Sequence, residues 1–395
     1  MKKSNNYNLL FDSLIFTDVA ILQKKLLDWF EKNGRHWIPW KLKGDGTAAQ
    51  PGELIDPYRI WIAEVMLQQT QLKTVLPYWE AWMHALPTLE DLSQAEEEEV
   101  LLLWQGLGYY SRARRIHKSA KILICSIGSK KSLDPYAWPK DLDSWIALPG
   151  IGRSTAGSIV SSAFSVPAPI LDGNVKRVFS RLFASHHPVN KQVNSFWMFS
   201  QALIEVKTPR EFNQALMDMG ATICTPRKPK CSICPWKSFC IAYACYKPVD
   251  FPVKMIPKKV PFEEIGIGIV LNNIGQVLID KRKNSSELGG LWEFPGGKRE
   301  RQEAIQSTIS RELMEEMSIK VEIVKELMVL DHQYSHKKLR FYVHICKWIS
   351  GEIIPLACQE FRWVNPENLS KYPFPAANIK MIKVLLEYLI HEEKN

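Results

Sequence analysis

Four cysteines near the middle of the chain have the spacing of a metal site. Six residues separate Cys224 from Cys231, two separate Cys231 from Cys234, and five separate Cys234 from Cys240. Four thiolates in one short loop suit either a tetrahedral zinc ion or a four-iron cluster. Structural zinc sites usually combine two C-x2-C pairs, and this loop contains one. The spacing therefore favours an iron–sulfur cluster over zinc. The basic residues between the ligands could also present cations to phosphate.

A glycine-rich turn upstream of the cysteines could hold a phosphate group. In the segment 148–156, LPGIGRSTA, Gly150 and Gly152 precede a helical pattern at 153–163. Tight turns that leave backbone N–H groups free at the start of a helix bind phosphate oxygens. The alternative is an ordinary glycine-rich connection between helices. A phosphate contact of this kind grips the backbone of a nucleic acid without reading its sequence.

Two acidic residues are candidates for catalysis. Asp172 precedes a glycine in the segment 169–177, PILDGNVKR, where it could instead be a turn or N-cap residue. Glu64 lies in WIAEVMLQQTQ at 61–71, on a predicted helix lined by apolar residues, where the alternative is an exposed glutamate. A glycosidic bond breaks through an oxocarbenium-like state, which one carboxylate stabilises while a second group protonates the leaving group. Glu64 and Asp172 could share that work.

A second acidic pattern lies near the C-terminus. After the segment WEFPGG, the sequence runs Gly297-x5-Glu303-x7-Arg311-Glu312-Leu313-x-Glu315-Glu316. Glu312, Glu315 and Glu316 fall on one face of a helix. Such a face suits Mg²⁺ and pyrophosphate chemistry, although a solvated acidic helix is the alternative.

These residues need two kinds of scaffold. Helical periodicity predicts helices at 20–32, 59–70, 73–84, 97–104, 112–126 and 153–163, with two more within 191–221. The segment 247–261 holds four prolines without periodicity, which is typical of a linker. Beyond it, β-rich runs flank one helix at 301–317, and a second helix closes the chain near 376–391. The pattern predicts a multi-domain protein, all-α and then α+β.

Composition limits the classes of partner and compartment. The chain has 395 residues, a net charge of +9 and a pI near 9.0, which is typical of proteins with an anionic partner such as nucleic acid. Charge alone does not identify the partner, and a solvated basic surface without a partner is an equally good explanation of it. No apolar run reaches the length of a membrane span, and charged residues interrupt the N-terminal stretch that resembles a signal peptide. We therefore expect a cytoplasmic protein with no membrane partner. The other four cysteines are expected to be small buried residues.

The cysteine loop and the glycine-rich turn resemble those of the endonuclease III superfamily of helix-hairpin-helix DNA glycosylases. Within it, EVMLQQTQ, GLGYYSR at 106–112 and ILDGNVKR resemble the MutY-type adenine DNA glycosylases. The resemblance covers roughly residues 20–245. It implies a helical glycosylase domain at 1–246, a hairpin at about 141–163, a [4Fe-4S] loop at 224–240, a linker at 247–261, and a Nudix-like domain at 262–395.

The same resemblance implies roles for individual residues. Glu64 would protonate N7 of an adenine flipped out of double-stranded DNA, Asp172 would stabilise or trap the sugar cation, and Asn174 would position these groups. Gln69 and one of two tyrosines would fill the gap and wedge beside 8-oxoguanine. The full set of expected DNA contacts in this part is Gln69, Thr70, Leu107, Tyr109, Tyr110, Gly150, Gly152 and Ser154. Bifunctional members of the superfamily carry a lysine where this chain has Ser154, so we expect a monofunctional enzyme.

The C-terminal segment resembles the Nudix box, with Ser318 in place of the final glycine. MutY-type enzymes have a Nudix-like domain that reads 8-oxoguanine in the opposite strand, and Tyr334, Ser335 and His336 match its recognition loop, with Tyr in place of Phe. The nearly intact box leaves two readings: recognition of the lesion alone, which we favour, or additional Mg²⁺-dependent hydrolysis of an oxidised nucleotide. The expected substrate is adenine opposite 8-oxoguanine or guanine, and the expected state is a monomer.

Overall fold

The computed structural model describes residues 18–50, 52–245, 247–253, 260–334 and 337–392. The chain forms two compact units. The first comprises Met1–Val75, Met83–Ser93 and Lys118–Ile256, and the second comprises Leu76–Trp82, Gln94–His117 and Pro257–Asn395. Within the described ranges, no helix has the length and apolar character that crossing a membrane would require.

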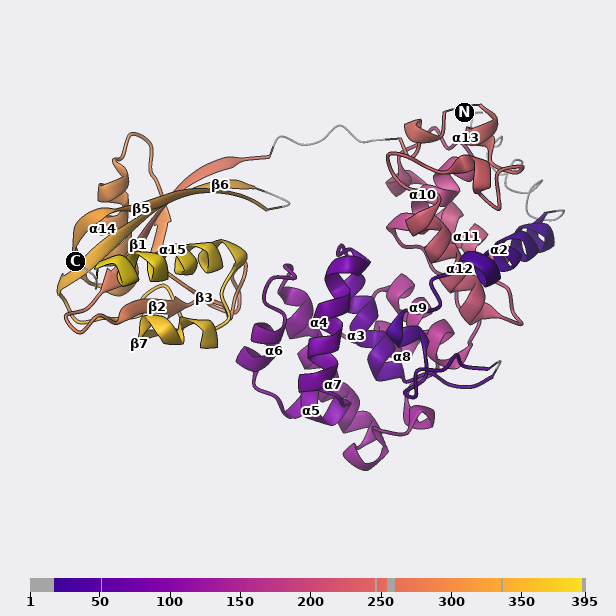
Figure 1. The fold of residues 1–395 in the computed structure, drawn as a ribbon, viewed down its shortest axis with the longest axis horizontal. Helices are drawn as coiled ribbons and strands as arrows, with labels where there is room; N and C mark the ends of the chain where they lie inside the picture. Colours follow the sequence, from indigo (N-terminus) through magenta and orange to yellow (C-terminus); the bar gives the residue numbers. More distant parts are fainter. Residues whose placement is uncertain (1–17, 51, 246, 254–259, 335–336, 393–395) are drawn as a thin grey trace, which may run out of the picture. The chain divides into compact units, whose positions relative to one another are not determined.

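The described N-terminal part is helical (Figure 1). Its α-helices are α2 (Val19–Asn33), α3 (Pro57–Leu67), α4 (Leu72–Ala85), α5 (Leu89–Gln94), α6 (Glu97–Leu103), α7 (Ser111–Ile127), α8 (Leu142–Ile146), α9 (Arg153–Phe164), α10 (Gly173–Leu182), α11 (Val193–Leu203), α12 (Pro209–Thr222) and α13 (Ile241–Ala244).

Local chemistry explains where the important helices begin. Asp56 caps α3 by accepting a hydrogen bond from the N–H of Tyr58 at 2.9 Å, and Pro57 occupies the first helical position, where its missing N–H costs nothing. Gly152 precedes α9 in extended conformation. Helix α10 was not predicted from its apolar periodicity, and it begins because Asp172 caps it. These starts place Glu64 within α3 and Asp172 at the N-terminus of α10.

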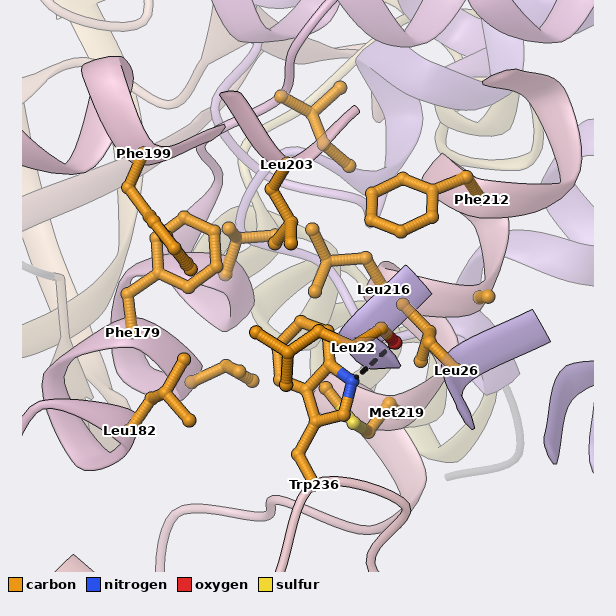
Figure 2. Packing of buried hydrophobic residues seen from close by; sticks show 14 of the residues in the cluster. Leu22, Leu26, Phe179, Leu182, Phe199, Leu203, Phe212, Leu216, Met219 and Trp236 are labelled. Carbon is orange, nitrogen blue, oxygen red and sulfur yellow. Dashed lines mark hydrogen bonds between the residues drawn. The ribbon is translucent and has the colours of Figure 1, made fainter. Parts of the chain in front are cut away.

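The core of the first unit gathers apolar residues that are far apart in the sequence. Leu22 and Leu26 of α2 pack with residues of α10, α11 and α12 (Figure 2). The fully buried Trp236, inside the cysteine loop, closes this cluster and donates its indole N–H to the carbonyl of Leu22 at 2.9 Å. The cysteine loop is therefore anchored to the same core that supports α10.

The C-terminal part of the second unit is a mixed sheet with helices packed on its two faces. The strands are β1 (Phe262–Leu271), β2 (Val277–Lys281), β3 (Trp292–Glu293), β4 (Gly296–Lys298), β5 (Lys320–Gln333), β6 (Lys338–Ser350) and β7 (Glu360–Val364), and the helices are α14 (Ile305–Met317) and α15 (Ala376–Glu392). The main path is β3-β2-β1-β6-β5, with β4 beside β1 and β7 beside β2. Strands β1 and β6 are parallel, with Phe262 opposite Lys338.

Side-chain alternation along β1 divides its residues between the two faces. Ile267 and Ile269 join the cluster that includes Met381 of α15, whereas Val270 joins the cluster of Leu313 in α14. The glycines of the GIGIV segment allow α14 to approach closely, because a Cβ on Gly268 would lie 2.9 Å from Leu313. The predicted α-helical part followed by an α+β part is confirmed.

The boundary region between the helical part and the sheet begins with ordered contacts. Pro248–Asp250 form a short 3-10 helix, and Phe251 is buried against Ala184 and Ala242. Residues 254–259 lie outside the described residues. The domain limits and the linker at 247–261 stay predictions.

Candidate active site and DNA-binding surface

A cavity of about 920 Å³ in the first unit brings the two predicted catalytic carboxylates together. Glu64 enters it from α3, and Asp172 enters from the start of α10. Burial raises the pKa of Glu64 to about 7, against a hydrogen bond from Ser158 that favours the anion. The negative charge of Asp172 also raises this pKa, and Lys41 lowers it. At neutral pH Glu64 is thus poised to hold or release a proton.

Asp172 is held in place by its own helix. One carboxylate oxygen accepts from the N–H of Val175 at 2.8 Å, and the other accepts from the side-chain amide of Asn174 at 3.1 Å. Burial raises the pKa of Asp172, although these two hydrogen bonds and Arg177 oppose the shift. The Ser154 hydroxyl accepts a hydrogen bond from the N–H of Leu171 at 2.9 Å, which fixes the backbone directly before Asp172.

An ion-pair group on the cavity wall was missed from the sequence. Asp218, whose side chain is 2% exposed, pairs with Arg35 and with Lys41, the latter at 3.2 Å. Burial alone would raise the pKa of Asp218, but Lys41 and Arg35 hold it below its ordinary value. Desolvation lowers the pKa of Lys41 against the pull of Asp218. No spacing signal in the sequence marks these three residues, since Asp218 lies 183 residues after Arg35 and 177 residues after Lys41.

The residues predicted to contact DNA in the first unit have suitable backbone geometry. Gly150 has a φ of +82°, and Gly152 lies exposed at the start of α9, where the first N–H groups have no partner within the helix. Gln69 and Thr70 line the cavity beyond the end of α3. Gln69 is exposed with a φ of +59°, a left-handed conformation that is costly for a residue with a Cβ.

Two arginines of α10 connect that helix to the cysteine loop. Arg181 is 2% exposed, and its guanidinium lies 3.3 Å from Cys224 Sγ while donating to the carbonyls of Thr225 and Pro226. Arg177 donates to the carbonyl of Cys224 at 2.7 Å and to the side-chain carbonyl of Asn174 at 2.9 Å. Their i, i+4 spacing directly after Asp172 is the sequence signal that could have revealed them.

The four predicted ligands, Cys224, Cys231, Cys234 and Cys240, are all unpaired and partly buried. In the described part of the chain, no three His, Cys, Asp or Glu side chains converge closely enough to hold a single metal ion. Around one zinc ion all four sulfurs would converge at about 2.3 Å from the metal, whereas each ligand of a four-iron cluster binds a different iron. Four cysteine thiols are the donor set of an iron–sulfur cluster.

The paired tyrosines of the second unit have different environments. Tyr109 is 42% exposed, has a φ of +49°, and its ring lies 5.5 Å from the guanidinium of Arg112. Tyr110 is 3% exposed, and Leu107 of the same loop is also buried. Of the two residues predicted as the wedge, only Tyr109 presents a large free surface.

The acidic helix of the second unit is engaged with arginines and with other acids. Arg311 bonds to Glu303, Glu312 and Glu315. Burial raises the pKa of Glu316 to about 7, and the negative charge of Glu293 adds to the shift. Ser318 ends α14 with a φ of +59°, the left-handed position where a glycine is usual.

Two further acids close to Glu316 were missed from the sequence. Asp280 is 6% exposed, and among the described residues its Oδ1 has no hydrogen-bond partner. Burial and the neighbouring Glu293 raise the pKa of Asp280. Of the predicted recognition loop, Tyr334 is half-buried with its ring 4.6 Å from His332, and Ser335 and His336 lie outside the described residues.

Comparison with known proteins first defines the class. Residues 62–197 match the model of the HhH-GPD superfamily base excision DNA repair proteins, residues 224–240 match the iron–sulfur binding domain of endonuclease III, and residues 266–384 match the NUDIX domain. The fold is that of a base-excision DNA glycosylase with an iron–sulfur segment and a Nudix-like domain. The predicted iron–sulfur cofactor and DNA as substrate are confirmed at this level.

Curated relatives then define the family. The chain is 32% identical to the adenine DNA glycosylase of Homo sapiens, with 94% of this chain and 75% of the relative covered. It is 33% identical to the adenine DNA glycosylase of Buchnera aphidicola subsp. Baizongia pistaciae, over 94% of this chain and 99% of the relative. The chain belongs to the adenine DNA glycosylases, and the predicted enzyme class is confirmed.

Proposed function

We propose that the enzyme removes adenine paired with 8-oxoguanine or guanine in double-stranded DNA, acting as a monomer. The observation that carries this proposal is the cavity in which Glu64, with a pKa of about 7, lies with Asp172. A general acid works best when its pKa is near the working pH. A carboxyl group of ordinary pKa would be almost fully ionised at neutral pH and would have no proton to give.

The proposed reaction begins with a flipped adenine in the cavity, because the reacting atoms are not accessible inside a duplex. Glu64 donates its proton to N7, so that adenine leaves as a neutral base. The bond between the sugar and the base then breaks, and the carboxylate of Asp172 stabilises or traps the cation. A water molecule adds to the same sugar carbon and loses a proton, which leaves an abasic site and frees Asp172. Asn174 keeps the Asp172 carboxylate in position through its amide hydrogen bond.

We also propose that the enzyme is monofunctional. A lyase would need an amine to form a Schiff base with the sugar, and Ser154 occupies the predicted position with its hydroxyl engaged by the N–H of Leu171. Borohydride should therefore trap little enzyme on abasic DNA. Efficient trapping would contradict this part of the proposal.

For DNA binding, we propose that Gly150 and Gly152 hold a backbone phosphate and that Gln69, with Thr70 beside it, fills the gap left by the flipped base. Tyr109 is proposed as the wedge because its ring is exposed, with Leu107 and Tyr110 supporting its loop. Flat side chains can stack where a base has been removed.

We propose that Cys224, Cys231, Cys234 and Cys240 hold a [4Fe-4S] cluster. Burial raises the pKa of the Cys234 thiol to about 12, so binding of a cationic centre is what would draw out its proton. When bound, the cluster would supply a fixed loop geometry and no step of base removal. Arg181 and Arg177 then connect that loop to the helix of Asp172.

For the Nudix-like part we propose recognition of 8-oxoguanine through Tyr334, Ser335 and His336, without hydrolysis. The predicted Mg²⁺ ligands do not fit the ion well, because Arg311 binds Glu312 and Glu315 and no three acidic groups of the described residues converge on one point. Full-length enzyme with Mg²⁺ and 8-oxo-dGTP should release no pyrophosphate. Release that is lost in Glu316→Gln would favour the hydrolytic alternative.

The central test is adenine release from a duplex carrying adenine opposite 8-oxoguanine. We expect the wild type to release adenine and Glu64→Gln to lose about 10²–10⁴-fold in rate, the usual contribution of a general acid. Absence of release by the wild type, or unchanged release by the variant, would contradict the proposal.

A further inference from the structure

Within the second unit, the backbone of one residue near the start of α15 is held from both sides by side chains of the segment 105–110. The N–H of Phe374 donates to the side-chain carbonyl of Gln105 at 2.7 Å. The carbonyl of Phe374 accepts a hydrogen bond from the hydroxyl of Tyr110 at 3.1 Å. The backbone N–H and carbonyl of Phe374 are thus both hydrogen-bonded, by Gln105 and Tyr110, which lie before and after the proposed wedge Tyr109 in the sequence.

The same tyrosine holds the wedge loop itself. The hydroxyl of Tyr110 accepts the N–H of Gly106 at 3.2 Å while it donates to Phe374. Tyr109 has a φ of +49°, a left-handed conformation that is costly for a residue with a Cβ and persists only while the surrounding structure holds it. Movement of the Tyr110 anchor should therefore displace Tyr109.

Phe374 is in turn fixed to the sheet. Its ring packs against Phe294 with centroids 5.8 Å apart, and the carbonyl of the adjacent Pro373 accepts from the N–H of Trp292 at 2.9 Å. Trp292 lies on β3 and also donates its indole N–H to Glu98 at 3.3 Å. A continuous set of packed and hydrogen-bonded groups therefore runs from β3 to the Tyr109 loop.

We propose that Tyr110 and Gln105 are positioning residues that transmit recognition of the opposite base to the wedge. Tyr334 of the proposed recognition loop packs against the hydrophobic cluster that contains Phe374. Binding of 8-oxoguanine beside Tyr334 would therefore fix Phe374, and the two side chains would then hold Tyr109 in its inserted position. The inference rests on the proposed function, in which the Nudix-like part reads the lesion. Hydrogen bonds between a backbone amide and uncharged side chains suit this role because they form only in a defined geometry. Salt screens them little because neither partner is charged.

The test compares single-turnover adenine release opposite 8-oxoguanine with release opposite guanine, using full-length enzyme. Tyr110→Phe removes the hydroxyl and keeps the ring, and Gln105→Leu removes the acceptor for Phe374. We expect each to lower the rate opposite 8-oxoguanine about five- to tenfold, the equivalent of one hydrogen bond. The rate opposite guanine should fall less than the rate opposite 8-oxoguanine, so the ratio of the two rates should decrease, since no lesion contact is transmitted when the opposite base is guanine.

Two matched variants separate positioning from loop stability. Tyr78→Phe removes another hydroxyl that anchors the same loop, through the carbonyl of Gln105 at 2.9 Å, without touching Phe374. Gln105→Glu keeps an acceptor for the Phe374 N–H. Both should retain the preference for 8-oxoguanine. If Tyr78→Phe and Tyr110→Phe lose the same amount on both duplexes, the role is structural only and the proposal is wrong.

The same measurements distinguish failure of the proposed function from failure of the coupling to Tyr109. A wild type that releases no adenine contradicts the proposed function itself. A wild type that releases adenine equally opposite both bases contradicts lesion recognition and with it the coupling. A wild type with a clear preference that Tyr110→Phe and Gln105→Leu both retain overturns the coupling alone.

Discussion

The two units each contain a glutamate whose pKa is raised to about 7, and the two sites differ in what surrounds the carboxyl group. Glu64 lines a cavity of about 920 Å³ together with Asp172 and Lys41. Glu316 lies with the acids Glu293 and Glu312 and near Arg282. Burial is the largest cause of both pKa shifts. A raised pKa by itself therefore does not distinguish the two sites.

The comparison shows that a perturbed pKa identifies a reactive acid only when a substrate can reach it. Glu64 has space beside it for a base and a second carboxylate held at a helix start. Around Glu316, Arg311 binds the carboxylates that a metal would need. The Nudix sequence pattern is therefore present at a site where its glutamates are paired with Arg311.

After the loss expected for Glu64→Gln, the next largest expected effect is the loss of activity in Asp172→Asn, with Glu316→Gln as its counterpart in the second unit. Asparagine caps a helix as well as aspartate does, so α10 should remain, while loss of the charge should lower adenine release by about 10²–10³-fold. Glu316→Gln should leave the rate unchanged. Equal losses of Asp172→Asn and Glu316→Gln in single-turnover assays would show that adenine release depends on the acids of both units.

The pH dependence of adenine release should follow Glu64. Only the protonated carboxyl can donate, and its pKa is about 7. When chemistry limits the rate, the rate should therefore fall about tenfold for each pH unit above that value. A single-turnover profile from pH 6 to 9 measures the limb, and a flat profile in this range would rule out Glu64 as the acid.

Replacement of Lys41 should shift that profile. The positive charge of Lys41 lowers the pKa of Glu64, so Lys41→Met should move the falling limb to higher pH. Because this effect is the smallest of those acting on Glu64, we expect a shift of less than about one pH unit, or 1.4 kcal/mol. The exposed Lys24→Met is the matched control, and a limb that moves to lower pH would contradict the stated direction.

The smallest effect is expected on stability in the second unit. The pKa of Asp280 is raised in the folded chain, so the folded state retains a proton that the unfolded state loses, and stability falls as pH rises above the unfolded value. Asp280→Asn removes this loss and should raise the unfolding midpoint at pH 8 by about 2–4 °C. Calorimetry at pH 5 and pH 8 should show the larger gain at pH 8.

Much of the fold was predictable because its signals are local. Helical periodicity, the proline-rich segment and the β-rich runs predicted the order of the main elements, and the motifs predicted Glu64 and Asp172 as neighbours in one site. Helix α10 was missed although its sequence carries the signal, because its buried residues Val175, Val178, Phe179 and Leu182 have helical spacing. The choice between Tyr109 and Tyr110 depends on burial, which identical adjacent residue types cannot reveal.

The remaining site residues depend on contacts that are distant in the sequence. Asp218 meets Arg35 and Lys41 only after α12 packs beside the N-terminal segment. Asp280 looks like an ordinary polar residue of a strand, and its burial next to Glu293 follows from sheet pairing between β2 and β3. The grouping of Gln94–His117 with the C-terminal part likewise has no local signature.

The cap of α10 has a consequence for observing the reaction. Asp172 Oδ1 accepts the N–H of Val175 at 2.8 Å, so the proposed cation-stabilising group is also the first hydrogen-bond acceptor of this helix. If the carboxylate bonds to the sugar, its charge is lost and the cap weakens, a change worth about 1 kcal/mol. Amide hydrogen exchange at Val175 should then speed up in a trapped intermediate, so one backbone proton would report the stage of the chemistry.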